Sequence, residues 1–176
     1  MSLSCIEAWN RWREENANVR PDLHKANLRK VDLTGVNLSK GDLRGAYLFL
    51  ADLRETDLRW ADLVGADLSG AYLNYTDLRW ADLTGADLSG AYFNGADLRW
   101  AHLTGADLAG TRFTETDLRW ADLGDIRNGG SVKLDGTNLK GVKNPPKGFL
   151  DWAKEHGAVS STRNTWRDDV RKNTHG

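Results

Sequence analysis

The chain has 176 residues, 28% of which are charged, and its formal net charge at pH 7 is −1. A chain of this length fits one domain of ordinary size. No apolar run approaches the roughly 20 residues that a membrane-spanning helix needs. The single Cys5 excludes an internal disulfide framework.

The N-terminal residues predict a helix. They lack a basic start followed by an apolar core, so they do not resemble a secretory signal, and we expect a cytoplasmic protein. Ser4 and Glu7 have the spacing of a capping box, and Pro21 marks a point where the helix has ended. Apolar residues recur at helical spacing between them: Ile6, Trp9 and Trp12. We predict an amphipathic helix over residues 4–17 within an N-terminal cap of residues 1–20, with Trp9 and Trp12 packed on the core.

An apolar residue then falls at every fifth position without a break, from Leu23 to Leu123. Two positions before each one lies a small residue, mostly Ala, and the residue between them is usually Asp. A period of five fits neither an α-helix nor a continuous strand. It fits a chain that turns after every unit of this length, with the small residue and Leu inside and Asp outside. The last two positions of each unit are often Gly, Ser, Thr or Asn, which favour turns.

A longer period shows how many turns close one coil. The sequence of residues 76–95 nearly recurs as residues 96–115, so the pattern as a whole repeats after every four units. Four units therefore make one coil, and successive coils stack into an all-β solenoid. A core of stacked Leu and Ala leaves no room for a ligand inside, and we expect no cofactor.

The units that carry this argument also carry a family resemblance. ADLTG, ADLSG and ADLRW resemble the A(D/N)LXX unit of pentapeptide-repeat proteins, and the resemblance covers residues 21–144. It implies a right-handed quadrilateral β-helix. It also implies one class of partner, because some members of this family are similar to duplex DNA in width and charge and bind type II topoisomerases.

The register slips once, after Leu123, and then the repeat ends. A loop insertion at residues 126–131 is predicted to replace one unit, after which VKLDG and TNLKG resume. Pro145 and Pro146 should end the ladder, because Pro has no backbone N–H to donate.

A C-terminal helical cap and polar tail are expected over residues 145–176. The segment KGFLDWAKEHG predicts a second short helix that ends at Gly157. Trp166 and Val170 mark either one more short helix or a loose tail. Three apolar residues of the second helix form a candidate dimer or cap surface, which makes a homodimer through the C-terminal cap a hypothesis: Phe149, Leu150 and Trp152.

Outward columns of identical residues are the candidate binding surface. One Trp and one Arg recur in each of four coils, beside a column of Asp residues at positions 57, 77, 97 and 117. One interpretation is corner packing left by repeat duplication, with Trp rings stacked and Arg paired with Asp. The other is a binding strip for a partner, because Trp and Arg are enriched at interface hot spots. The strip consists of Arg59, Trp60, Arg79, Trp80, Arg99, Trp100, Arg119 and Trp120.

We expect neither a catalytic site nor a metal site. His102 interrupts the Asp column at positions 62, 82 and 122, but nothing in the unit demands a metal there. The carboxylates lie in regular columns on a convex rod, without a cleft that would perturb their pKa values. No phosphate-binding loop, zinc-protease motif or CxxC pair is present in the sequence.

The sequence therefore predicts a non-enzymatic scaffold that presents side-chain ladders to another protein. The alternative is a DNA mimic that binds a type II topoisomerase such as gyrase, inhibiting or protecting it. Against this alternative, Arg residues interleave with the Asp columns, and the central residues are mostly Leu where such mimics favour Phe. Direct nucleic-acid binding through the strip would use phosphate contacts and base stacking, which the neighbouring Asp column opposes.

Overall fold

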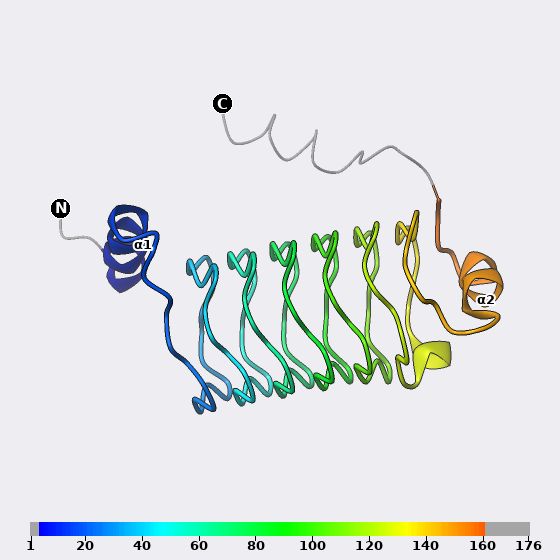
Figure 1. Cartoon of the computed structure of the whole chain (residues 1–176), viewed down its shortest axis with the longest axis horizontal. Helices are drawn as coiled ribbons and strands as arrows, with labels where there is room; N and C mark the ends of the chain where they lie inside the picture. The colour runs from blue at the N-terminus through cyan, green and yellow to red at the C-terminus, as the bar shows by residue number, and fades with distance from the viewer. Residues whose placement is uncertain (1–3, 161–176) are drawn as a thin grey trace.

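The structure is a computed structural model that describes residues 4–160. The chain winds through a row of stacked coils with one helix beyond each end of the row (Figure 1). The predicted helix around Trp166 and Val170 lies outside the described residues.

Each coil has four sides. Parallel bridges join the outward residue of each unit to the outward residue of the fourth unit after it, starting from Asp22, Asn27, Asp32 and Asn37 in the first coil. We call the sides that begin at these residues the first, second, third and fourth face. The predicted longer period of four units is thus one complete four-sided coil.

The hydrogen bonds of one unit explain the period of five. Asp82 N–H donates to the Ala61 carbonyl of the preceding coil at 2.9 Å, and Leu83 N–H donates to the His102 carbonyl of the following coil at 2.7 Å. Ala86 N–H then donates back to the Leu83 carbonyl at 3.0 Å, which closes a tight turn. The third residue of that turn, Gly85, has φ +66°, the left-handed conformation that a type II turn requires.

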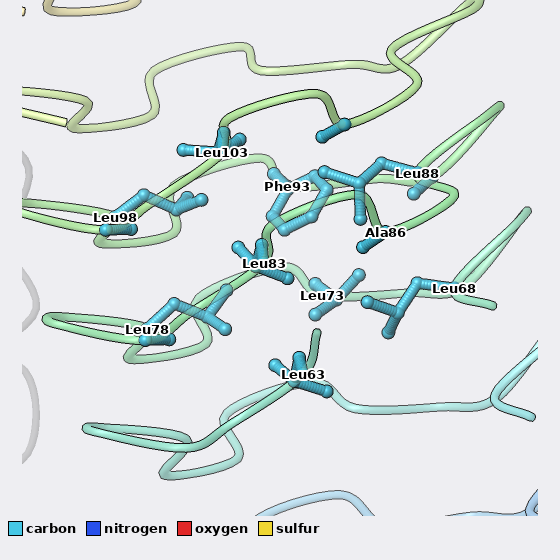
Figure 2. Packing of buried hydrophobic residues seen from close by; sticks show 14 of the residues in the cluster. Leu63, Leu68, Leu73, Leu78, Leu83, Ala86, Leu88, Phe93, Leu98 and Leu103 are labelled. Atoms are coloured by element: carbon cyan, nitrogen blue, oxygen red, sulfur yellow. The ribbon is translucent and has the colours of Figure 1, made fainter. Parts of the chain in front are cut away.

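The core is a set of aligned Leu columns. The central residues from Leu43 to Leu123 are at most 2% exposed, and Figure 2 shows Leu63, Leu83 and Leu103 one above another. Some inward small positions carry Thr instead of Ala, as at Thr76. Its hydroxyl donates to the Leu53 carbonyl at 2.6 Å, so the buried polar group has a partner.

Helix α1 (Cys5–Glu15) follows the predicted capping box. Ser4 Oγ accepts the Glu7 N–H at 3.2 Å, and Glu7 Oε2 accepts the Ser4 N–H at 2.7 Å. These hydrogen bonds to Ser4 lower the pKa of Glu7. The expected core packing is wrong for Trp12, which is 40% exposed and leans on the Trp9 ring, whereas Trp9 is partly buried against the core.

The interruption of the repeat is shorter than the predicted loop. Ile126 is buried and Arg127 still bridges to Asp107, so only residues 128–131 leave the regular path. A short 3₁₀ helix, η1 (Gly129–Ser131), occupies this place. It lengthens the coil by a single position, because Arg112 bridges to Lys133 and not to Val132.

The C-terminal end carries helix α2 (Phe149–Glu155), which buries Phe149 and Ala153. The prolines do not end the ladder, because the chain returns after α2 and Val159 bridges to Asn138. Within residues 4–160, no helix has the length and apolar character to cross a bilayer.

Candidate functional site

The Trp residues occupy the corner of the coil that follows the fourth face. All four have φ between +60° and +64°, where a non-glycine residue costs roughly 1–2 kcal/mol. Their rings stack in a continuous column, with centroid separations of 5.0, 4.7 and 4.9 Å and interplanar angles of 10° or less. Stacking contributes about 0.5–1.5 kcal/mol for each pair beyond area burial, which offsets much of the backbone strain.

Each Arg of the strip binds the Asp of its own unit through two N–H groups of its guanidinium. In each coil the Arg Nε donates to Asp Oδ1 at 2.8–2.9 Å and Nη2 donates to Oδ2 at 2.6–2.8 Å. Each fork is therefore bidentate, the strong geometry for such a pair. These hydrogen bonds raise the pKa of Arg59, Arg79 and Arg119.

The pairs also connect one coil to the next. The Nε atoms of Arg59, Arg79 and Arg99 lie 3.9, 3.5 and 3.6 Å from the Asp Oδ2 of the following coil. Cations and anions thus alternate along the fourth face from Asp57 to Arg119. The column of Asp residues is neutralised, and the Trp rings are the apolar part of a surface without strong net charge.

The four Trp residues of the strip differ in exposure. The sequence did not predict this difference, because the repeat units are nearly identical. Trp60 is 56% exposed and Trp80 is 40% exposed, whereas Trp100 and Trp120 are half-buried. Beyond Trp120 the column ends at Gly141, where an added Cβ would lie 2.8 Å from the Trp120 ring. The accessible part of the strip is therefore its N-terminal half.

Sequence reasoning missed a second surface, because its residues belong to different units of each coil. We call it the acidic side, and it consists of Asp67, Asp82, Asp87 and Asp107 on the first and second faces. Among residues 4–160, no Lys or Arg forms an ion pair with any of these four carboxylates.

Local hydrogen bonds hold the acidic side in place. Asp87 Oδ1 accepts the Ser89 N–H at 2.9 Å, and Asp82 Oδ1 accepts the Thr84 N–H at 3.0 Å. A hydrogen bond from the Asn128 amide lowers the pKa of Asp107. The corners beside these carboxylates are glycines, as at Gly85 and Gly90.

The remaining predicted residues lie apart from both surfaces. Phe149 is buried in the core of its own chain, Trp152 is partly buried, and Leu150 is 37% exposed. Dimerisation through these residues stays a prediction, with Leu150 as its exposed member. Exposed His102 bridges to Asp82 and Asp122, and among the described residues no three His, Cys, Asp or Glu side chains form a group suited to a metal ion.

Comparisons with solved structures find pentapeptide-repeat proteins. One from the Arabidopsis thaliana thylakoid lumen is 28% identical, with a TM-score of 0.58, 83% of this chain covered and 91% of that one. A pentapeptide-repeat protein of Nostoc PCC 7120 is 38% identical, with a TM-score of 0.48 and coverage of 56% and 78%. QnrB1, a plasmid-mediated fluoroquinolone resistance protein, is 15% identical, with a TM-score of 0.44 and coverage of 82% and 85%.

Comparison of sequences identifies the family. No curated protein matches the chain. The family model described as pentapeptide repeats matches with eight copies, over residues 21–48, 51–90 and 91–126. These matches cover more than half of the chain and confirm the resemblance drawn from the repeat units. The chain belongs to the pentapeptide-repeat family.

Proposed function

We propose that the protein is a non-enzymatic interaction scaffold that binds another protein through the Arg–Trp strip. In this proposal a rigid rod, wound to the right as the family resemblance implies, presents the strip in the cytoplasm. The observation that carries the proposal is the stacked Trp column. Its rings are exposed at Trp60 and Trp80, and the charged residues beside them are paired with one another. Exposed apolar patches of this kind are typical of protein interaction sites.

The geometry of the Arg residues restricts the chemistry of the partner. Each guanidinium already donates Nε and Nη2 to a carboxylate of its own chain, so its charge is offset there and only its Nη1 edge is left for a partner. The largest exposed groups of the strip are the indole rings of Trp60 and Trp80. We therefore expect a partner surface with apolar or aromatic side chains rather than a nucleic acid.

Affinity capture tests this proposal. The parent protein would be immobilised beside the variant Trp60→Ser/Trp80→Ser, after circular dichroism has shown that the variant keeps its β structure. The matched control is Asp67→Asn/Asp87→Asn, which changes two outward residues of the second face, one in the coil of Trp80 and one in the next coil. We expect a captured protein that the control retains and the Trp variant loses by at least about tenfold. Equal capture by all three would refute the role of the strip.

A second candidate function uses the acidic side. The acidic side has four carboxylates over three successive coils, since Asp62 is ion-paired and His102 takes one place on the first face. With about 4.8 Å between coils, this gives one negative charge per about 3.6 Å of axis, against one per about 1.7 Å in duplex DNA. Four of the Arg residues that interleave with the Asp columns lie on the fourth face and pair there with Asp.

This candidate is a DNA mimic that binds a type II topoisomerase such as gyrase. The test is DNA supercoiling by gyrase in the presence of the parent protein and of Asp67→Asn/Asp82→Asn/Asp87→Asn. An effect of the parent that the Asp variant loses and Trp60→Ser/Trp80→Ser retains would favour this function over the first. No effect of the parent at micromolar concentration would remove it.

A further inference from the structure

The N-terminal end of the solenoid has an open edge, which becomes visible by comparison with an interior coil. In the interior, each face makes three backbone hydrogen bonds to the preceding coil. On the first face of one coil, Asp82 N–H donates to Ala61, while the carbonyls of Asp82 and Thr84 accept from Leu63 and Gly65. Every face therefore offers one N–H and two carbonyl groups toward the N-terminus.

On the fourth face of the first coil, side chains of α1 replace all three missing partners. Asn10 Oδ1 accepts the Asn37 N–H at 2.8 Å, and Trp9 Nε1 donates to the Asn37 carbonyl at 2.9 Å. Arg13 Nη2 donates to the Ser39 carbonyl at 2.9 Å. The helix thus substitutes for a coil on this one face, and Arg13 is 2% exposed as a result.

The other three faces have no such substitutes. Within residues 4–160, no hydrogen bond is made by the backbone N–H and carbonyl groups of Asp22, Asn27 and Asp32 that point toward the N-terminus. The apolar residues beneath them are also incompletely covered. Val31 is 36% exposed, and the inward Leu residues of these faces are only partly buried: Leu23, Leu28 and Leu33.

At the opposite end of the rod, a segment of the chain does pair with the exposed backbone of the last coil. Leu139 N–H donates to the Val159 carbonyl at 3.1 Å, and Val159 N–H donates to the Thr137 carbonyl at 2.7 Å. A very short extended segment is thus sufficient to add a rung to one face of this solenoid. The same kind of addition from another molecule is the β-strand addition by which many proteins bind extended peptides.

The charge of the open edge indicates which segment would bind. The units of the first and second faces, residues 21–30, contain Lys25, Arg29 and Lys30 besides His24, against a single acidic residue, Asp22. A second copy of this chain would bring the same cations together, which disfavours pairing between two such edges. Lysines on an edge strand also hinder nonspecific pairing. The same positive charges attract a segment that carries carboxylates.

We propose that the open edge on the first and second faces of the first coil binds an extended acidic segment of a partner protein. The segment adds one rung by pairing with the backbone of Asp22 and Asn27, places small and aliphatic side chains over Leu23 and Leu28, and turns its carboxylates toward Lys25, Arg29 and Lys30. This interface is separate from the Arg–Trp strip, and it stands or falls independently of the function proposed for that strip.

The probe for this proposal is the peptide ADLTGADLSG, which has the sequence of residues 81–90 and the correct alternation of inward and acidic residues. We would measure amide hydrogen exchange of the full chain by nuclear magnetic resonance, with and without the peptide. We expect exchange of the Asp22 and Asn27 amides to slow by at least about tenfold at saturation. The Asp32 amide on the third face should be unaffected, because a two-unit peptide covers only two faces.

Charge is tested on both molecules. The peptide AKLTGAKLSG should give no protection, and Lys25→Glu/Arg29→Glu/Lys30→Glu should weaken binding of the acidic peptide by about tenfold. Glu is acceptable at positions 25 and 30, where Lys25 and Lys30 have φ +52° and +58°, because Glu55 has φ +60°. The matched control, Lys133→Glu/Lys140→Glu/Lys143→Glu at the other end of the rod, should bind as the parent does.

Three results would overturn the proposal. Equal protection by both peptides would show that charge does not select the segment. No protection of Asp22 and Asn27 by the acidic peptide would show that the edge does not accept a strand. Concentration-dependent protection without peptide, together with a dimeric mass in light scattering, would show that the occupant is a second copy of the chain.

Discussion

The fourth face and the acidic side have the same backbone, and each has Asp at its outward positions. One surface is nevertheless neutral and aromatic, whereas the other is anionic. Asp77 is followed by Arg79 and Trp80, whereas Asp87 is followed by Ser89 and Gly90. On the fourth face the carboxylate is bound by an Arg fork and an aromatic corner stands beside it. On the acidic side the carboxylate accepts a backbone N–H and faces solvent beside a glycine corner.

This difference shows where the information about binding lies. The first three positions of each unit fix the core and the ladder and are nearly the same on both surfaces. The last two positions decide whether a surface is neutral and aromatic or anionic and smooth. These corner positions thus determine which partners each face of the rod can accept.

The largest expected effect on stability concerns the corners. Trp80→Ala removes two ring stacks and should lower the free energy of unfolding by about 2 kcal/mol. Trp80→Gly loses the same stacks but relieves the strain at φ +64°, so its loss should be smaller by about 1 kcal/mol. Gly85→Ala on the acidic side should cost about 1 kcal/mol for the reverse reason. Urea denaturation of the three variants measures these values, and a greater loss for Trp80→Gly than for Trp80→Ala would contradict this explanation of the corners.

Salt should separate partners of the two surfaces. Because the fourth face is neutralised, the Kd of a partner bound there should change by less than about twofold between 50 and 300 mM NaCl. A basic partner on the acidic side should lose about tenfold or more in affinity over the same range. Titration calorimetry at several salt concentrations measures this. A strongly salt-dependent Kd for a partner that Trp60→Ser/Trp80→Ser loses would contradict the assignment to the strip.

Removing one carboxylate should matter on one surface only. Asp77→Asn leaves Arg79 without its bidentate partner and should cost about 1 kcal/mol, a modest figure because both side chains are partly exposed. Asp87→Asn keeps an acceptor for Ser89 N–H and removes a charge between Asp67 and Asp107, so it should change stability by less than about 0.5 kcal/mol. Thermal denaturation of the two variants provides the comparison, and equal losses would show that the Arg forks contribute nothing.

The smallest expected effect is the loss of stability at low pH that results from protonation of Asp42. Hydrogen bonding from Arg44 lowers the pKa of Asp42 to about 2, below the ordinary value of 3.8. A carboxyl with a lowered pKa in the folded state stabilises the fold above its unfolded pKa, and this stabilisation disappears as pH falls through the folded pKa. The difference in Tm between the parent and Asp42→Asn should therefore shrink between about pH 4 and pH 2. Arg44→Gln removes the cause, and a parent that differs from Asp42→Asn equally at both pH values would contradict the explanation.

The regular part of the fold was predictable because a period of five admits few structures. The Leu register from Leu23 to Leu123 and the coil of four units both appear as expected. The capping box at Ser4 was visible as well, since it depends only on neighbouring residues. These features are local, or are repeated so often that local preferences add up.

The features that sequence reasoning missed depend on contacts between distant parts of the chain. Val159 adds a rung after Pro146 only because α2 returns the chain to the unit of Asn138, and no pattern in the sequence marks that return. Arg127 stays in the ladder although Asn128 breaks the Leu register. The acidic side emerges only when outward residues of successive units and successive coils are placed on adjacent faces, which requires the coil itself.

The claim that the Arg–Trp strip is the binding surface is tested most directly by quantitative capture with matched variants. The parent, Trp60→Ser/Trp80→Ser and Asp67→Asn/Asp87→Asn would be compared for the same bound protein by mass spectrometry. We expect the Trp variant to lose this protein by at least about tenfold while the Asp variant retains it. Loss with the Asp variant and retention with the folded Trp variant would refute the claim and assign binding to the acidic side.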